Sequence, residues 1–217
     1  MLEAKGVTKK YGSLQVLSGI DLFIHKKEVV SIVGASGAGK STLLHIIGTL
    51  DKPDTGTVFL NGQNLVQLQG NALAQFRNIH IGFIFQFHNL LPEFTALENV
   101  CIPGYLGKHD PKKVEARGKE LLNLLGLKDR YDHQPSRMSG GEQQRTAVAR
   151  ALINSPTIIF ADEPSGNLDS RNAEELHHLF FRLRDELDQT FVIVTHNEEL
   201  ATMADRKVEM KDGRISE

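Results

Sequence analysis

Small residues between positions 34 and 42 have the spacing expected of a phosphate-binding loop. The run reads GASGAGKST, fits the pattern G-x-x-x-x-G-K-[ST], and directly follows the apolar segment from Val29 to Val33. Backbone N–H groups at its glycines can surround phosphate oxygens, while Lys40 reaches the β- and γ-phosphates and Ser41 binds Mg²⁺. The apolar residues that follow predict a helix whose N-terminal dipole favours the anion. We expect the loop to bind a nucleotide through Gly34, Ser36, Gly37, Ala38, Gly39, Lys40, Ser41 and Thr42.

Two adjacent carboxylates end a second apolar segment, TIIFADEP, from Thr157 to Pro164. At the end of a strand the chain can turn, so that Asp162 holds Mg²⁺ through water while Glu163 faces an attacking water molecule. Alone, such a pair more often marks a solvated strand terminus. Because the same chain carries the phosphate-binding loop, we expect Asp162 to bind the metal and Glu163 to act as the general base.

Two further polar residues follow apolar segments. His196 comes directly after FVIVT, and Gln86 comes after IGFIF. Ligands collect at the carboxyl ends of strands in an open parallel sheet, so His196 is expected to donate to a γ-phosphate and Gln86 to approach Mg²⁺ or the water. Taken alone, the histidine would be interpreted as a surface or hydrogen-bonded structural residue.

A pair of glycines occupies the start of a predicted helix in RMSGGEQQR. Ser139 and Glu142 form an S-x-x-E capping box, in which each bonds the backbone of the other. Gly140 and Gly141 each cost about 1 kcal/mol relative to alanine inside a helix, so we expect another molecule to approach this backbone closely. The free N–H groups suit a γ-phosphate bound by a second copy of the chain, docked head-to-tail. The alternative is a capped helix with a flexible entry.

The elements that must position these residues follow an α/β pattern. The runs EVVSIVG, TIIFADE and TFVIVTH predict strands buried on both faces of a sheet. Nearer the N-terminus, DLFIHKKEVV and TGTVFLNGQNL predict hairpins, the second with an Asn61-Gly62 turn. We therefore predict one domain over residues 1–217. It comprises a core with a mostly parallel sheet and an N-terminal antiparallel β annex, over about residues 1–94 and 152–217, and an inserted helical subdomain over about residues 95–151.

Composition narrows the class of protein. The chain has 217 residues, of which 40% are hydrophobic and 24% charged, as is usual for a soluble globular protein. A formal net charge of -2 gives no global attraction to nucleic acid, and no nucleic-acid partner is expected. The single cysteine, Cys101, excludes an internal disulfide. No apolar run approaches the roughly 20 residues needed to cross a bilayer, so work at a membrane would need a partner.

The chain resembles the nucleotide-binding subunit of ATP-binding cassette (ABC) transporters in its motifs and in their order along the sequence. These are the phosphate-binding loop, Gln86, MSGGEQQR, FADEP, SGNLD and His196. The resemblance covers nearly the whole chain and implies a P-loop ATPase core that hydrolyses ATP with Mg²⁺. It implies that Tyr11 stacks on adenine and that Asp169 belongs to a loop communicating between protomers. Two ATP molecules would lie between two chains, each completed by the partner's Ser139, Gly140, Gly141 and Glu142. Met138 departs from the usual leucine, and Glu142 occupies a position often held by glutamine.

A narrower resemblance is carried by FQFHNLLPEFTALENV, which is similar to a segment in the ATPases of lipoprotein-releasing transporters. In the ABC family the segment after Gln86 faces the membrane subunits. We therefore expect residues 86–100 to contact integral membrane proteins at the cytoplasmic face of a bacterial inner membrane. The ATPases of macrolide efflux and cell division resemble the chain too. An ABC ATPase acting on DNA or ribosomes is disfavoured by the lack of a long heptad insertion or second cassette.

Overall fold

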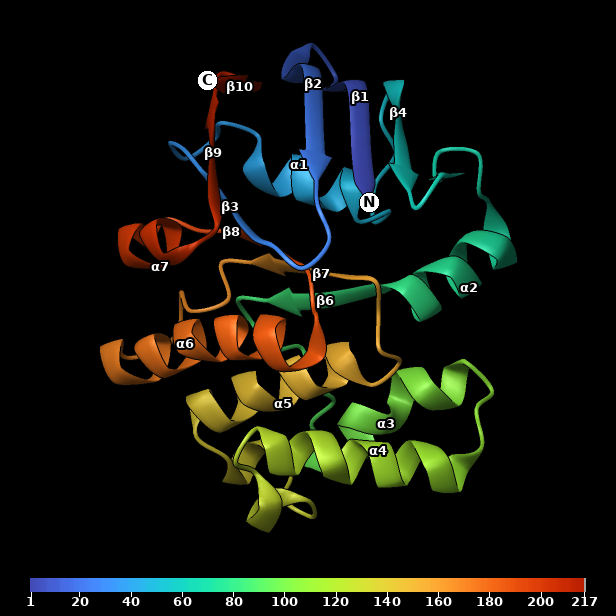
Figure 1. The fold of residues 1–217 in the computed structure, drawn as a ribbon, viewed down its shortest axis with the longest axis vertical. Coiled ribbons are helices and arrows are strands. Elements are labelled where there is room, and N and C mark those ends of the chain that lie inside the picture. The colour runs from blue at the N-terminus through green and yellow to red at the C-terminus, as the bar shows by residue number, and fades with distance from the viewer. Residues whose placement is uncertain (217) are drawn as a thin grey trace. The chain divides into compact units, whose positions relative to one another are not determined.

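The computed structural model describes residues 1–216, which form two compact units (Figure 1). The first unit is built from both ends of the chain, Met1–Arg77 and Phe181–Glu217. The second unit is the intervening Asn78–Phe180. The helical subdomain predicted over residues 95–151 lies within the second unit, and its division from the ATPase core at residues 94 and 151 stays a prediction.

An antiparallel sheet forms the N-terminal part of the first unit. Its strands are β1 (Leu2–Tyr11), β2 (Leu14–Ile24), β4 (Thr55–Leu60) and β5 (Gln63–Asn64). β1 lies between β2 and β4, and β5 pairs with β4. Asn61 and Gly62, at φ 49° and 84°, form the tight turn between β4 and β5 that the sequence predicts. The antiparallel annex is therefore confirmed. The hairpin predicted over DLFIHKKEVV is wrong, because its first half pairs with β1, whereas Val29 and Val30 pair in parallel with Phe191 and Val192 in another sheet.

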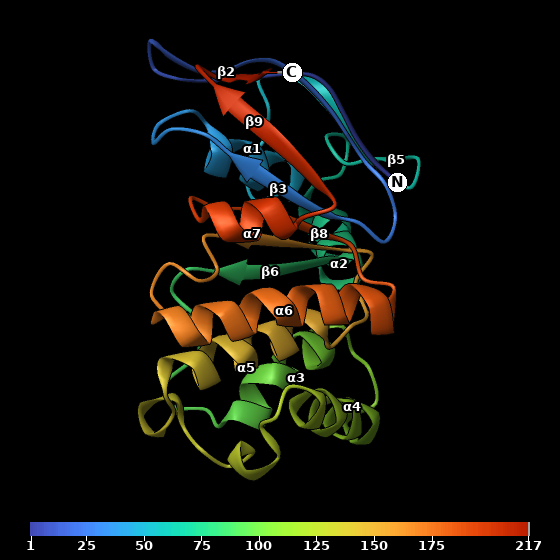
Figure 2. The ribbon, with the colours of Figure 1, turned by 60° about the vertical axis from the view of Figure 1, so that its left-hand side comes forward.

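Parallel pairing in the first unit fixes the edge from which the phosphate-binding loop emerges. The elements are β3 (Val29–Val33), α1 (Lys40–Ile47), β8 (Phe191–Val194), α7 (Glu198–Met203), β9 (Arg206–Lys211) and β10 (Arg214–Ser216). β3 pairs in parallel with both β8 and β9, and β9 lies beside β3 in Figure 2. β3 and β8 are buried almost throughout, as their uninterrupted apolar sequences predict. The residues that follow β3 and β8 therefore leave the sheet at the same edge.

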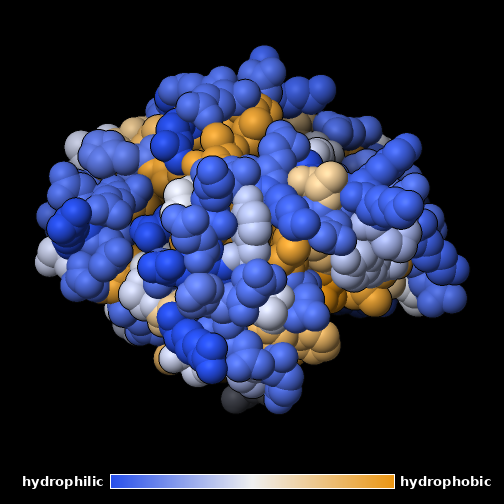
Figure 3. Space-filling view, turned by 90° about the horizontal axis from the view of Figure 1, so that it is seen from below, coloured by the Kyte–Doolittle hydropathy of each residue, from blue (hydrophilic) through white to orange (hydrophobic). Residues whose placement is uncertain are grey.

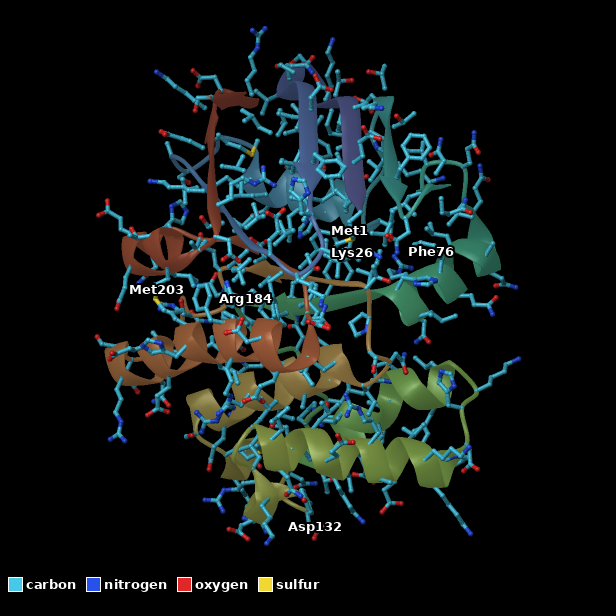
Figure 4. All side chains as sticks on the ribbon, viewed as in Figure 1. Met1, Lys26, Phe76, Asp132, Arg184 and Met203 are labelled. Carbon is cyan, nitrogen blue, oxygen red and sulfur yellow. The ribbon has the colours of Figure 1, made fainter. Side chains whose placement is uncertain are left out.

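Each of the two points at which the sequence passes from one unit to the other falls within a helix. These helices are α2 (Gly70–His80) and α6 (Ser170–Leu187). Within the first unit, the end of α6 is held by Arg184, labelled in Figure 4, whose guanidinium donates to the Asp205 carboxylate just before β9.

The second unit combines two parallel strands with a group of helices. Its elements are β6 (Ile81–Phe85), α3 (Ala96–Leu106), α4 (Pro111–Leu124), the short helices η1 (Lys128–Arg130) and η2 (Pro135–Arg137), α5 (Gly140–Leu152) and β7 (Ile158–Asp162). α3, α4 and α5 pack against one another, and buried Val100, Leu121 and Val148 contribute to their core (Figure 1). β6 and β7 pair in parallel, with Phe85 opposite Asp162. This register brings the residues after both strands to one edge.

Candidate functional site

The predicted phosphate-binding loop joins β3 to α1 in the first unit. Gly34, Gly37 and Gly39 have φ values of 144°, 80° and 97°, which residues with a side chain rarely adopt. A Cβ atom added at Gly34 would lie 2.1 Å from the carbonyl oxygen of Met210. Residues 35–37 are exposed, so the tip of the loop is open to solvent. The glycines therefore permit a backbone path that presents this loop to a ligand.

Lys40 and His196 lie together at this edge of the first unit. The Lys40 ammonium is buried and donates to the carbonyl oxygens of Gly34 and Ala35, each at 3.0 Å. It also lies 3.4 Å from Nε2 of His196, which follows β8 by two residues. Ser41 and Thr42, in the first turn of α1, are half-buried. The parallel pairing of β3 and β8 thus brings together two of the predicted phosphate-binding groups.

Tyr11 ends β1 beside the same loop. The tyrosine is 51% exposed, and its hydroxyl donates to Asp51 Oδ2 at 2.6 Å, near the side chain of Thr42. The bond to Asp51 is the main cause of a raised pKa of Tyr11. Lys9 contacts both residues: Nζ is 2.9 Å from Asp51 Oδ1 and 5.2 Å from the centre of the Tyr11 ring. The predicted base-binding tyrosine is therefore held next to the phosphate-binding loop.

At the edge of the second unit, Gln86 and Glu163 follow the paired residues Phe85 and Asp162. Glu163 has φ 47°, a left-handed conformation uncommon for a residue with a side chain, which gives the turn predicted at this strand end. Gln86 Nε2 donates to Asn167 Oδ1 at 3.0 Å, and Asn167 Nδ2 donates to the Gln86 carbonyl oxygen at 3.2 Å. Through this pairing the Gln86 amide keeps its side-chain oxygen as the atom that could bind a cation.

The predicted metal ligands have the chemistry that Mg²⁺ requires. Ser41, Gln86 and Asp162 offer a hydroxyl, an amide oxygen and a carboxylate, all hard oxygen donors. Protein sites for Mg²⁺ typically supply one or two carboxylates and leave the remaining positions to water and substrate phosphates. This donor set therefore fits Mg²⁺ bound together with a nucleotide. Within residues 1–216, no cluster of three or more His, Cys, Asp or Glu side chains is arranged to hold a metal ion.

The capping box predicted at the start of α5 is present in the second unit. Ser139 Oγ accepts from the Glu142 N–H at 3.3 Å, and Glu142 Oε2 accepts from the Ser139 N–H at 2.8 Å. Arg130 Nε donates to the other carboxylate oxygen of Glu142 at 2.8 Å. Burial alone would raise the pKa of Glu142, but the hydrogen bonds from Ser139 and Arg130 outweigh it and lower the pKa. Both oxygens of this carboxylate are thus engaged within the chain.

The two glycines after Ser139 have different surroundings. A Cβ atom at Gly141 would lie 2.2 Å from Asn172 Oδ1, whereas one at Gly140 would meet only Leu168 Cδ2, at an ordinary 3.7 Å. Asn172 donates from its backbone and its side chain to Asp169, at 2.9 and 2.7 Å, and these bonds lower the pKa of Asp169. A side chain at Gly141 would therefore have to displace the side chain of Asn172, whereas the packing places no such demand on the exposed Gly140.

A buried glutamine connects α5 to the ends of β6 and β7. Gln144 is fully buried, and its Nε2 donates to the carbonyl oxygens of Phe85 and Pro164, at 3.2 and 2.6 Å. Its Oε1 is hydrogen-bonded to Nδ1 of His88. Because an amide oxygen only accepts, Nδ1 of His88 carries the proton of that bond. The role of Gln144 was not predicted from the sequence, since a glutamine within a polar helical stretch carries no signal of burial.

Apolar side chains are exposed on the segment that follows Gln86. Phe87, Leu91 and Phe94 are 70%, 44% and 40% exposed, so packing in the core does not account for them. Asn99 fixes the backbone of the last two: its Nδ2 donates to the carbonyl oxygens of Leu91 and Phe94, each at 3.1 Å. One face of the molecule, in Figure 3, shows hydrophobic patches among mostly hydrophilic atoms. No helix within residues 1–216 has the length and apolar character needed to span a bilayer.

Known proteins resemble this chain along its whole length. The family model for "ABC transporter" matches residues 17–166. The lipoprotein-releasing system ATP-binding protein LolD of Cytophaga hutchinsonii is 62% identical over 215 residues, covering 99% of this chain and 98% of the relative. LolD of Bacteroides fragilis is 60% identical over 215 residues, covering 99% and 100%.

Solved structures extend the comparison to three dimensions. A dimeric structure of the bacterial ABC transporter cassette MJ0796 has a TM-score of 0.91 and 40% sequence identity, covering 100% of this chain and 97% of the other. A second dimeric structure of MJ0796, in a post-hydrolysis state bound to ADP and Pi, has a TM-score of 0.90 with the same identity and coverage.

Proposed function

Because the chain belongs to the ABC transporter family, we propose that its ATP hydrolysis powers the release of lipoproteins from the inner membrane of a bacterium. The observation that carries this proposal is the 62% identity, over 99% of the chain, to a lipoprotein-releasing system ATP-binding protein. The relatives favour this function over the macrolide-efflux and cell-division alternatives. They also favour it over an ABC ATPase that acts on DNA or ribosomes.

The proposed role of the first unit is to bind ATP. The ring of Tyr11 stacks on adenine, and residues 34–42 surround the phosphates with backbone N–H groups. Lys40 neutralises charge on the β- and γ-phosphates, and His196, 3.4 Å from that ammonium, donates to the γ-phosphate. These groups act mainly by positioning the nucleotide and by stabilising the charge that develops on the transferred phosphoryl group.

The second unit is proposed to supply the proton acceptor. The Glu163 carboxylate accepts a proton from the attacking water as the new bond to the γ-phosphorus forms and the bond to ADP breaks, and Gln86 orients that water. The oxygen donors Ser41, Gln86 and Asp162 would hold Mg²⁺. When bound, Mg²⁺ neutralises negative charge on the β- and γ-phosphates. The left-handed turn at Glu163 supports this assignment, because it redirects the chain immediately after Asp162.

A second copy of the chain is proposed to complete each nucleotide site. Ser139, Gly140 and Gly141 would present the N-terminus of α5 to the γ-phosphate held by the partner, while Glu142 holds the turn and Asp169 lies at the interface. The support for this role is the exposure of Ser139 and Gly140 together with the packing freedom at Gly140. ATP closes this head-to-tail dimer in the proposal, and hydrolysis reopens it.

The membrane partners are proposed to bind the segment from Gln86 to Val100. An amphipathic cytoplasmic helix of an integral membrane subunit would cover Phe87, Leu91 and Phe94, whose exposure is otherwise costly. The protein would thereby be held peripherally at the cytoplasmic face of the inner membrane.

The test is an affinity purification that uses the ATPase in its ATP-bound form. Tagged Glu163→Gln protein is expected to keep ATP, lose turnover and accumulate in the closed state, because an amide cannot accept the proton. It is mixed with detergent-solubilised membranes, with and without ATP, and the retained proteins are identified by mass spectrometry. Glu186→Gln, which removes the same charge from an exposed position of α6, is the matched control.

Recovery of lipoprotein-releasing membrane subunits would support the proposal. Recovery of efflux or division subunits instead would overturn the proposed substrate while leaving the ATPase intact. Normal ATP turnover by Glu163→Gln protein would remove Glu163 as the base.

A further inference from the structure

Half-buried Asp51 and buried Lys9 form a support for Tyr11 in the first unit. The Tyr11 hydroxyl donates to Asp51 Oδ2 at 2.6 Å. Asp51 is held in turn through Oδ1, which accepts from Lys9 Nζ at 2.9 Å and from the Lys52 N–H at 2.7 Å. Lys9 is 8% exposed and also donates to the Lys52 carbonyl oxygen at 2.6 Å. Every member of this chain of contacts is therefore fixed by another.

The arrangement leaves the ring of Tyr11, and not its hydroxyl, available to a ligand. Lys9 Nζ lies 5.2 Å from the ring centre, within the range of a cation–π contact, and the Lys9 ammonium is itself buried. Tyr11 stays half-exposed next to Thr42 of the phosphate-binding loop. A half-exposed aromatic side chain would ordinarily sample several rotamers, and binding would have to immobilise it.

From these contacts we propose that Asp51 and Lys9 are positioning residues, which hold the Tyr11 ring in the orientation that an adenine base requires. The inference rests on the proposed function, in which Tyr11 stacks on the base of ATP. The support acts on the base only, because neither Asp51 nor Lys9 belongs to the phosphate-binding loop. The hydrogen bond to Asp51 does not compete with the ligand, because stacking uses the face of the Tyr11 ring and leaves the Tyr11 hydroxyl bonded to Asp51.

A comparison between a nucleotide and a ligand that has phosphates but no base distinguishes this positioning role from a general structural role. Dissociation constants are measured by titration calorimetry for ATP and for inorganic tripolyphosphate, which has no base. Tyr11→Phe keeps the ring and removes the hydroxyl that bonds Asp51, and Asp51→Ala removes the acceptor of that bond. Both variants are expected to weaken ATP binding roughly three- to tenfold, a loss on the scale of one ordinary intramolecular hydrogen bond, and to leave tripolyphosphate binding unchanged.

A double variant and a matched control complete the experiment. Because Tyr11 and Asp51 act through one bond, the double variant Tyr11→Phe/Asp51→Ala should bind ATP no more weakly than the weaker single variant. Asp54→Ala removes a neighbouring carboxylate that bonds the Lys10 N–H and is expected to bind ATP like the unaltered protein. Unchanged tripolyphosphate binding also shows that each variant is folded.

Different results would overturn the positioning role of Asp51 and Lys9 and the proposed stacking of Tyr11 on adenine. If Tyr11→Ala weakens ATP binding while Tyr11→Phe and Asp51→Ala bind normally, the ring stacks without support and the positioning role is wrong. If Tyr11→Ala itself binds ATP normally, the stacking assigned to Tyr11 fails as well. Equal weakening of ATP and tripolyphosphate binding would mean that the support merely holds the loop together, which also overturns the inference.

Discussion

A single carboxylate in the second unit illustrates how surroundings decide what a residue does. Glu142 stands where the family often has glutamine, yet its two oxygens accept from the Ser139 N–H and from Arg130. Glutamine could repeat the first bond, but it could not pair with the guanidinium as an anion. We therefore assign the charge of Glu142 to holding the turn before α5, where an acidic residue is also favoured by the helix dipole.

The lowered pKa of Glu142 gives a prediction for the effect of pH. A carboxyl group whose pKa is lower in the folded state stabilises the fold above its unfolded pKa, and this contribution is lost as pH falls through the folded pKa. Glu142→Gln is expected to lower the free energy of unfolding by about 1 kcal/mol at pH 7, with the difference shrinking below about pH 4.5. Urea denaturation across this range measures it, with Glu186→Gln as the control. A difference that stays constant with pH would contradict the assignment.

At the scale of elements, the second unit is held together by buried polar side chains as well as by apolar packing. Gln144 of α5 bonds the carbonyl groups at the end of β6 and after β7, while Asn99 of α3 bonds the segment that leaves β6. Arg150 of α5 also donates to the carbonyl oxygens of His88 and Asn89. The backbone after β6 is therefore fixed from two helices, and a displacement of this segment would be transmitted to α5.

Loss of the Gln144 amide should destabilise the fold. Gln144→Leu leaves two buried carbonyl groups without their donor, which should cost roughly 2 to 4 kcal/mol and lower the melting temperature by about 5 °C or more. Gln143→Leu is the matched control, since Gln143 is only half-buried and bonds the nearby carbonyl groups of Pro135 and Met138. Equal melting temperatures for the two variants would show that the buried connection is unimportant.

Features that depend on residues close together in the chain could be predicted from the sequence. The glycine-rich turn between β3 and α1, the Asn61-Gly62 turn and the Ser139 capping box each have a local physical cause, and all three are present. Contacts between distant segments were missed. Asp51 lies forty positions from Tyr11, and the only signal for Lys9 was that it shares a face of β1 with Tyr11. The contact between Gly141 and Asn172 depends on how α5 and α6 meet, which no spacing within either helix reveals.

At the scale of the whole molecule, the proposed unit of function is a dimer of this chain. The two MJ0796 structures similar to it are dimeric, and one is bound to ADP and Pi. Packing around the two glycines of α5 determines which of them can be substituted without disturbing the chain itself. A side chain at Gly141 would collide with Asn172 in its own chain, whereas one at Gly140 fits without collision. Gly140 is thus the position at which the effect of a partner can be separated from the effect on folding.

Gly140→Asp is expected to prevent ATP-dependent dimer formation without reducing ATP binding by the single chain. The added carboxylate would lie at the N-terminus of α5, where it would repel the partner's γ-phosphate. Light scattering in the Glu163→Gln background, where the closed form should accumulate, measures the dimer, and calorimetry measures ATP affinity. Gly140→Ala controls for the added Cβ atom alone. A dimer of unaltered abundance with Gly140→Asp would rule out docking through this helix end.

The left-handed backbone at Glu163 has a consequence for the evolution of the chain. Holding a residue with a side chain in this conformation costs about 1 kcal/mol or more, whereas glycine would adopt it freely. Folding alone would therefore select glycine at this position, and a carboxylate there reduces heat tolerance. In the proposed mechanism, in which Glu163 is the base, the chain trades that tolerance for turnover, so mutations that raise thermal stability at this turn should be found among inactive variants.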